Sequence, residues 1–475
     1  MASPKQARSG FSAALKSTSV ALAIAALAAC GGGVGGGDSP SVAGTTGPAA
    51  ASPGAPVATG TPVGTGTSTG ASASGTGPAA SATGAAQAPV VFQRADFQVN
   101  TNTAGSQAGA NVARLATGGY VVVWDSSPSY GAIEVHMQRL DAQGQPAGAE
   151  QVVSAQGNGS QVTAFADGKF LVTWRFSPYA YQVDAHGQMF DAQGGRVGGE
   201  MLLGSALNSY LPRPMALPDG SFIAAIDTEA GKYGPSYGLL QRYGADGTPV
   251  GQATRLESQL SVQMTSYSPN SAGQAHTALL ADGRIAAAWI ARGTGIAELR
   301  LTLLDGQAVP LATSTLLSGA DALYEAPAIT ALPNGGAMVS WVTGAYDQPK
   351  TAYMAMLDAN GTMGTPRVLA TTGANVDLTV QLATLADGNV VATWSTASFD
   401  PAALRKRSQV AQRFSGSTGA ALGAALPIDT ATSDGTDNLF PLDSQAVTAT
   451  TGSGFLALYG RWTAQDSWEV RATVR

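Results

Sequence analysis

A five-residue apolar segment that ends in a large side chain recurs seven times between residues 120 and 459. The last residue of each copy, here called the anchor, is Trp in five copies. The seven anchors, separated by 50, 52, 63, 52, 53 and 65 residues, are Trp124, Trp174, Ile226, Trp289, Trp341, Trp394 and Tyr459. A period this regular indicates one repeated structural unit rather than several unrelated domains. The repeat shows no 3.6-residue periodicity, which argues against a helical solenoid.

Each copy carries the same series of predicted strands and turns. A strand of small residues is followed by an Asp-Gly type turn, the anchor strand, a variable stretch, a third strand ending near Asp, and a Gly turn before a short fourth strand. The anchor strand, as in 170–174, is largely apolar on both faces, so both faces must be covered. Sheets stacked radially cover one another in this way, and ring closure removes the need for capping units. The repeat therefore predicts an all-β, seven-bladed β-propeller of four-stranded antiparallel blades.

The two ends of the repeat region complement each other. The seventh copy stops after its third strand, 468–475, and lacks a fourth strand. Residues 96–100, ahead of the first copy, look like an isolated fourth strand. We predict that this N-terminal strand completes the last blade, so that residues 89–475 form one non-covalently closed propeller. The first strands of the copies, such as 162–164 and 382–384, carry small or β-branched residues that suit crowding around a central axis.

Composition narrows the class of protein. Charged residues make up 12% of the chain and 60 residues are Gly, which favours strands joined by tight turns over long surface helices. The formal net charge of −6 provides no broad positive field, so we expect no nucleic-acid partner. A single cysteine excludes an intrachain disulfide and a thiolate zinc cluster. We therefore expect a monomeric propeller, stabilised by burial, with no metal and no cofactor.

The first 29 residues have the features of an export signal. Lys5, Arg8 and Lys16 precede the apolar run 20–29, which is too short to span a bilayer. The run ends in Leu-Ala-Ala-Cys, with the cysteine at Cys30, and this resembles the lipobox of bacterial lipoproteins. The resemblance implies cleavage before Cys30, acylation of its thiol and, because Gly31 follows, sorting to the outer membrane. The alternative is a plain secretory signal with an incidental cysteine.

Residues 30–88 are predicted to form a disordered tether. From position 31 to 88 the chain is almost wholly Gly, Ala, Ser, Thr and Pro, with Asp38 as its one charge. Such a segment cannot bury enough apolar surface to become ordered. A flexible linker of this length reaches about 40 Å, which is enough to clear lipid headgroups. The segment also matches the GxGxxG motif of dinucleotide-binding sites and the GxSxG motif of nucleophile elbows. Both motifs need a flanking strand and helix, which this segment lacks, so neither match predicts a site.

The repeat itself resembles the generic blade repeats of bacterial secreted and surface proteins across essentially all of residues 89–475. The resemblance concerns architecture. The sequence lacks the Ser-x-Asp-x-Gly-x-x-Trp box of sialidases, the Gly-His to Trp-Asp pairing of WD40 blades, and the DxDxDG calcium loop of integrin-type blades. The functions of those families are therefore not implied for this chain.

One face of the predicted propeller is the candidate ligand face. In an antiparallel meander the second-to-third loops and the connections between blades share one end, and these are the variable segments. Aromatic platforms with a few polar groups suit sugar or peptide recognition. The alternative is that these aromatic residues cover the blade ends. The aromatic candidates are Tyr130, Tyr179, Tyr181, Tyr233, Tyr237, Tyr346, Phe399 and Trp462, and they are accompanied by Asp125, Asp227, Asp347, Asp400 and Arg461.

The sequence gives no motif for catalysis. His136, His186 and His276 fall in or near predicted third or first strands, without HExxH spacing or a partner that would activate a nucleophile. The leading hypothesis is a membrane-anchored binding or scaffold lipoprotein that recognises a glycan or a protein. A carbohydrate-active enzyme using paired carboxylates of the variable face is the first alternative. An assembly factor of the outer membrane is the second.

Overall fold

The structure is a computed structural model, and it describes most of the chain after residue 93. The described ranges are 94–129, 132–179, 182–207, 212–229, 236–256, 275–293, 296–319, 323, 325–345, 347–398, 405–433, 446–462 and 468–475. They all belong to the second of two compact units, Met1–Gly84 and Ala85–Arg475. The predicted signal, Cys30 and the predicted tether lie outside the described residues. Within the described ranges, no helix has the length and hydropathy needed to cross a membrane.

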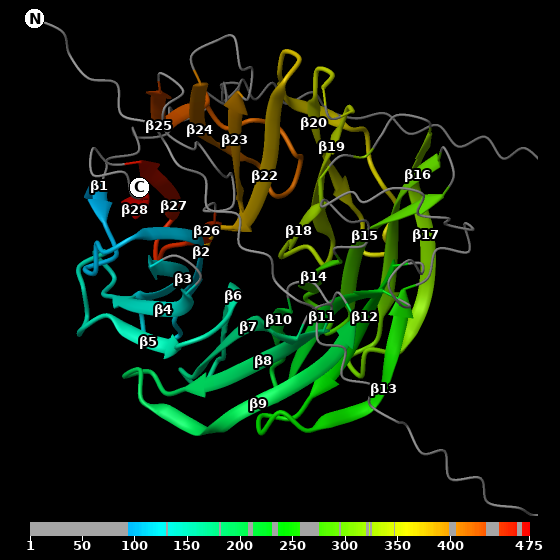
Figure 1. Cartoon of the computed structure of the whole chain (residues 1–475). Helices are drawn as coiled ribbons and strands as arrows, with labels where there is room; N and C mark the ends of the chain where they lie inside the picture. The colour runs from blue at the N-terminus through cyan, green and yellow to red at the C-terminus, as the bar shows by residue number, and fades with distance from the viewer. Residues whose placement is uncertain are drawn as a thin grey trace, which may run out of the picture. The chain divides into compact units, whose positions relative to one another are not determined.

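The second unit is built from seven antiparallel four-stranded sheets, which confirms the predicted all-β seven-bladed propeller. Each of the first six sheets uses four consecutive strands, with the first strand innermost (Figure 1). Blade 1 contains β2 (Ser106–Arg114), β3 (Tyr120–Ser129), β4 (Ala132–Leu140) and β5 (Gln151–Ser154). Blade 2 contains β6 (Asn158–Ala164), β7 (Phe170–Tyr179), β8 (Gln182–Phe190) and β9 (Arg196–Leu207). Blade 3 contains β10 (Arg213–Ala216), β11 (Phe222–Glu229), β12 (Ser236–Tyr243) and β13 (Pro249–Leu256).

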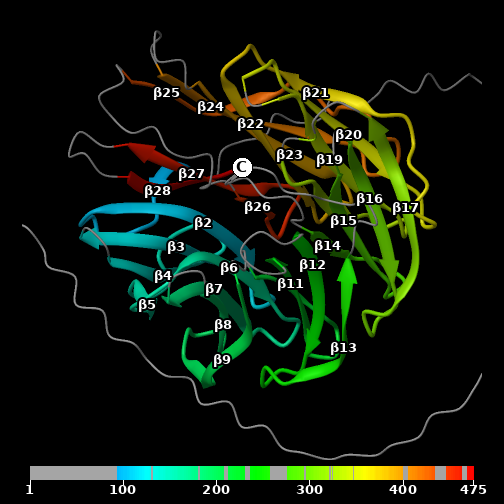
Figure 2. The same cartoon turned by 45° about the vertical axis from the view of Figure 1, so that its right-hand side comes forward.

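The next three blades repeat this plan. Blade 4 contains β14 (His276–Leu279), β15 (Ile285–Gly293), β16 (Ile296–Leu304) and β17 (Pro310–Gly319). Blade 5 contains β18 (Ala328–Ala331), β19 (Ala337–Thr343), β20 (Thr351–Leu357) and β21 (Arg367–Thr371). Blade 6 contains β22 (Val376–Thr384), β23 (Val390–Ser398), β24 (Arg405–Phe414) and β25 (Leu426–Ser433). Neighbouring first strands are in contact all the way round, from β2 through β6 to β26 and back to β2, so the ring is closed (Figure 2).

Blade 7 combines both ends of the described chain. It contains β26 (Ala446–Ala449), β27 (Phe455–Trp462) and β28 (Trp468–Val474), and its fourth strand is β1 (Arg94–Gln98). Phe97 pairs with Ala472 and Gln98 pairs with Arg471 in an antiparallel ladder, and the two segments lie side by side in Figures 1 and 2. This confirms the predicted closure, because the last blade is completed by hydrogen bonds to the N-terminal strand.

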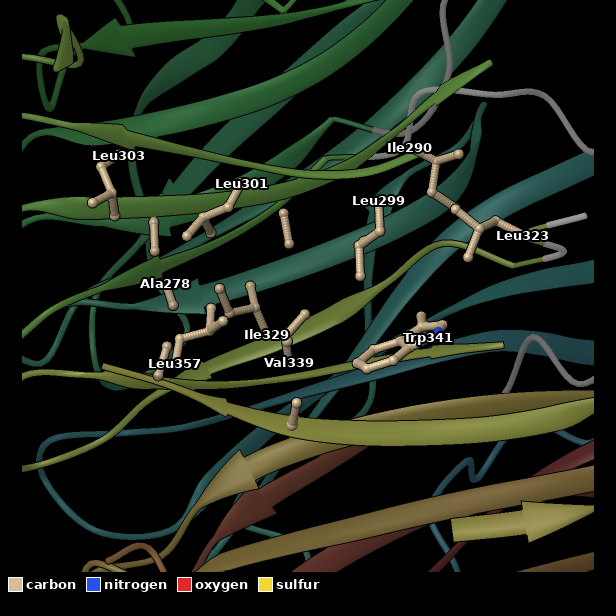
Figure 3. Close-up of a cluster of buried hydrophobic side chains, with 14 of the residues drawn as sticks. Ala278, Ile290, Leu299, Leu301, Leu303, Leu323, Ile329, Val339, Trp341 and Leu357 are labelled. Carbon is tan, nitrogen blue, oxygen red and sulfur yellow. The ribbon is translucent and has the colours of Figure 1, made fainter. Parts of the chain in front are cut away.

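The core of the propeller consists of apolar clusters between neighbouring blades. The described residues form seven such clusters, one for each pair of neighbours, including the pair formed by blades 7 and 1. Between blades 4 and 5, Leu299 and Leu301 of β16 face Val339 and Trp341 of β19 (Figure 3). All five anchor tryptophans are buried, which agrees with the prediction that both faces of the anchor strand are covered. Fully burying such a side chain stabilises the fold by about 1.5–3 kcal/mol or more.

Arginine side chains link blades at the end of the propeller that carries the tight turns. Arg139 of blade 1 donates to the carbonyl of Ala192 in blade 2 (3.0 Å), and Arg284 of blade 4 donates to the carbonyl of Ala359 in blade 5 (2.6 Å). Blade 7 has no third-to-fourth turn of its own, because its fourth strand is β1. Arg475 instead donates from the C-terminus to the carbonyl of Pro427 in blade 6 (2.9 Å).

Candidate functional site

The strand order gives the propeller two different ends. First-to-second and third-to-fourth turns lie at one end, here called the turn face. Second-to-third loops and the connections between blades lie at the other end, here called the variable face. A ligand site is expected where loops of different length and composition surround a rigid scaffold, which is the variable face.

The structure places only part of the predicted aromatic set. Tyr130, Tyr181, Tyr233, Tyr346, Phe399 and Asp400 lie outside the described residues. The structure describes the backbone, but not the side chains, of Tyr179, Tyr237, Trp462 and Asp227, all of which lie near strand ends at the variable face. Asp347 is exposed in the β19–β20 loop and accepts a hydrogen bond from Gln348 (3.3 Å).

A polar arc on the innermost strands was not predicted from the sequence. One position on the first strand is equivalent in all seven blades. It lies thirteen residues before the anchor, and it pairs with the second-strand residue that comes just before the anchor. These equivalent positions form what we call the axial ring, whose members are Asn111, Gln161, Arg213, His276, Ala328, Gln381 and Ala446. Five of the seven side chains are polar, and three of them, Gln161, Arg213 and His276, follow one another on the adjacent strands β6, β10 and β14.

The ring residues of blades 3 and 4 are partly buried on the innermost strands. Arg213 and His276 are each half-buried and begin their strands at the variable-face end. Their cross-strand partners on the second strands, Ala225 and Ala288, are buried. Ala225 packs between blades 3 and 4 and Ala288 packs between blades 4 and 5, so Arg213 lies on the side of blade 3 that faces blade 4, and His276 lies on the side of blade 4 that faces blade 5.

The imidazole of His276 is held in its neutral form. Burial is the larger cause that lowers its pKa well below the usual value, and the nearby positive charge of Arg213 lowers that pKa further. A neutral imidazole offers one N–H donor and one acceptor nitrogen. The guanidinium of Arg213 stays charged, so a permanent cation acts on a neutral imidazole from the neighbouring innermost strand.

Two carboxylates on strands that lead to the variable face are engaged in contacts that hold the fold. Asp125, in the middle of β3, accepts the backbone N–H groups of Gly159 (2.6 Å) and Ser160 (3.1 Å) at the bulge of β6 in the next blade. Burial raises the pKa of this carboxyl to about 6, although these hydrogen bonds oppose the shift. Asp377 of β22 lies 3.6 Å from the buried ammonium of Lys350. Asp125, one of the predicted site residues, therefore joins blades 1 and 2.

The other two histidines pack against anchors. His136 lies opposite Trp124 and forms hydrogen bonds with Glu150 (2.7 Å) and Glu134 (2.9 Å). Burial alone would lower the pKa of His136, but these two carboxylates outweigh it and raise that pKa above its usual value. His186 lies opposite Trp174, and the two rings are stacked. No group of three or more His, Cys, Asp or Glu in the described ranges is arranged to hold a metal ion.

Comparisons with known proteins yield structural likenesses at low sequence identity. No family model matches the chain, and no curated protein matches it. A protein of unknown function from Dyadobacter fermentans is 12% identical over 80% of this chain and 97% of its own, with a TM-score of 0.43. An α-L-arabinanase from Penicillium chrysogenum, complexed with arabinobiose, is 11% identical over 80% of this chain and 98% of its own, with a TM-score of 0.42. The β-propeller domain of the trilobed protease from Pyrococcus furiosus is 9% identical over 78% of this chain and 94% of its own, with a TM-score of 0.40.

Proposed function

We propose that the protein is an extracytoplasmic binding lipoprotein, anchored to the outer membrane through Cys30, with its ligand site on the variable face of the propeller. The observation that carries this proposal is the polar part of the axial ring, which lies on innermost strands that enter each blade from the variable face. A rigid ring of strands that presents donors and acceptors beside variable loops suits recognition of a small polar ligand. The aromatic residues predicted for those loops would supply apolar platforms.

Binding is favoured over hydrolysis by the state of two described carboxylates, those of Asp125 and Asp377. A glycosidase needs two carboxyl groups on either side of the scissile bond, at a separation that leaves room for substrate. Asp125 is tied to two backbone N–H groups and Asp377 is paired with Lys350, so neither is a ready nucleophile or acid. The carbohydrate-active enzyme therefore remains the alternative, with any catalytic pair drawn from other acids of the variable face.

Two experiments test the proposal. Metabolic labelling with a fatty acid should modify the wild-type chain and leave Cys30→Ala unmodified, while Ser41→Ala in the same segment should be labelled normally. Cys30→Ala should also leave the membrane fraction. Folded protein should then retain a ligand on a glycan or peptide array without turning it over. Turnover in a hydrolase screen would support the enzyme instead, and co-purification with membrane complexes alone would support the assembly factor.

A further inference from the structure

Blades 5 and 6 leave a cleft between them at the turn face. The cleft has a volume of about 480 Å³, which lies within the range of about 300–1,000 Å³ that small-molecule sites occupy. Blade 5 contributes the end of β20 and the β20–β21 connection, and blade 6 contributes its third-to-fourth turn. β20 and β21 form the outer half of blade 5 (Figure 2). Among the residues that line the cleft are Met354, Met356, Pro366, Arg367 and Gly419.

A difference between the blades explains why this cleft is open. The third-strand residue that pairs with the position three before the anchor is Arg139 in blade 1, Arg242 in blade 3 and Met356 in blade 5. Arg139 donates to the carbonyl of Ala192 in the turn of blade 2 (3.0 Å). Arg242 donates to the side chain of Gln307 in the turn of blade 4. Met356 is shorter than arginine and has no donor, so it makes no such bridge to blade 6.

The blade 5 side chains of the cleft lie on one face of the sheet. Met354 and Arg367 are partners in the β20–β21 ladder, so their side chains share a face. Met354 belongs to the apolar cluster between blades 5 and 6 and Met356 packs against that cluster, so this face is the one toward blade 6. From blade 6, a Cβ atom added to Gly419 would lie 3.2 Å from Sδ of Met356. Met354 is buried, Met356 is half-buried and Arg367 is exposed, so the cleft has thioethers at its floor and a cation at its rim.

These lining groups favour a ligand that is both apolar and anionic. The described residues that line the cleft include no acid, and among the described residues no hydrogen bond or ion pair engages the guanidinium of Arg367. A guanidinium binds a carboxylate through two parallel hydrogen bonds. The sulfur atoms of Met354 and Met356 make favourable contacts with aromatic rings, and their flexible side chains adapt to the shape of a ligand.

We infer that the cleft between blades 5 and 6 binds a small aromatic carboxylate, with its ring against Met354 and Met356 and its carboxylate on Arg367. The cleft lies at the turn face, so this site is separate from the ligand site proposed for the variable face, and each is tested by itself. An aromatic ring shifts the NMR signals of methyl groups that it contacts. The methyl groups of the two methionines therefore report directly on a ligand in the cleft.

The test follows the full chain by NMR, with carbon-13 in the methyl groups of its methionines. The chain has ten methionines, so Met354→Leu and Met356→Leu identify the two signals. Phenylacetate is the probe, and it should shift both signals until the site is saturated. Phenylacetamide, the neutral control, should bind about tenfold more weakly, because it cannot form the charge-assisted pair. Cyclohexylacetate, which lacks the aromatic ring, should compete with phenylacetate about fivefold more weakly.

Variants separate the site from general electrostatics. Arg367→Gln should weaken phenylacetate binding by about tenfold, because the partner of the carboxylate is lost. Arg255→Gln removes the same charge from the exposed outer strand β13 of blade 3 and should bind normally. Equal weakening in both variants, or methionine signals that phenylacetate does not move, would overturn the site even if an array finds a ligand for the variable face. Equal binding of phenylacetamide would overturn the carboxylate assignment, and equal competition by cyclohexylacetate would overturn the aromatic one.

Discussion

The carboxylate of Asp96 in β1 accepts a hydrogen bond of 2.6 Å from Nη1 of Arg461 in β27, although the two residues lie 365 positions apart in the sequence. The same carboxylate accepts hydrogen bonds from Tyr459 (2.7 Å) and Arg471 (2.9 Å). Arg461 also reaches Asp429 of blade 6 (2.8 Å). The N-terminal strand is therefore held by its backbone ladder and by a polar network that extends into the neighbouring blade.

Replacing Asp96 by Asn should destabilise the closed ring at neutral pH. Asn tolerates the positive φ of 41° at this position, so the change removes mainly the charge. Because the carboxylate is partly exposed, the expected loss in free energy of unfolding is about 1–2 kcal/mol. Denaturant titrations at pH 7 measure it. Asp167→Asn, which breaks a local exposed pair with Lys169, is the matched control and should change stability by less than about 0.5 kcal/mol.

The effect of Asp96 should depend on pH in a stated direction. Burial alone would raise the pKa of this carboxyl, but hydrogen bonds from Tyr459, Arg461 and Arg471 outweigh it and hold that pKa below its usual value. A group with a depressed folded-state pKa adds stability above its unfolded pKa, near 4, and loses it as the pH falls through the folded value. The difference between wild type and Asp96→Asn should therefore shrink below about pH 4. A difference that grows in acid would contradict this role.

Gly454→Ala should destabilise the protein by about 1–3 kcal/mol through overpacking. A Cβ atom at Gly454 would lie 1.9 Å from the backbone oxygen of Arg475, which accepts the N–H of Phe455. Backbone must move to relieve this overlap. Gly452→Ala, two residues earlier, meets nothing within 4 Å and is the control. Thermal unfolding of both variants checks the prediction, and equal midpoints would show that the C-terminus is not fixed at this point.

Asp125→Asn should change how stability depends on pH. Burial raises the pKa of Asp125 to about 6, so between about pH 4 and pH 6 the folded protein keeps a proton that the unfolded chain has released. In this window the wild-type free energy of unfolding falls as pH rises. Asn cannot titrate, so the variant should gain roughly 1–3 kcal/mol relative to wild type between pH 4 and pH 7. Parallel curves for the two proteins would show that Asp125 titrates normally.

Leu301→Ala should cost about 2–5 kcal/mol, because it opens a cavity between blades 4 and 5. Leu311→Ala on the neighbouring strand β17 removes the same atoms from a side chain that is 56% exposed, and should change stability by less than about 0.5 kcal/mol. Urea titrations of the two variants give the comparison. Similar losses in both would argue against interfaces between blades as the core.

Much of the fold could be predicted from local sequence because every blade repeats the same apolar segment. The anchor Trp341 and its equivalents mark the second strands. The seventh copy has no fourth strand after 468–475, which indicates that the N-terminal segment supplies it. The side-chain network around Asp96 could not be predicted in this way. Asp96 lies in β1 and its partners lie in β27 and β28, so their meeting depends on register and on a bulge in β1.

The candidate site was harder to find than the fold. Arg213 and His276 are 63 residues apart in sequence, and the connections before them differ in length, so their equivalence is not visible until both are counted back from Ile226 and Trp289. That constant offset of thirteen residues is a signal that sequence reasoning could have used. The predicted aromatic residues of the variable loops, such as Tyr130 and Tyr181, remain a prediction.

Closure of the ring by β1 is tested most directly by a disulfide between Gln98→Cys and Arg471→Cys in the full chain carrying Cys30→Ser. These residues are partners in the ladder, next to the hydrogen-bonded pair Val99 and Val470, so their Cα atoms are close enough for a disulfide. Mild oxidation should give one intramolecular disulfide per chain, seen as faster migration on a non-reducing gel and reversed by reductant. Free thiols, or disulfides only between chains, would show that the first and last strands do not pair.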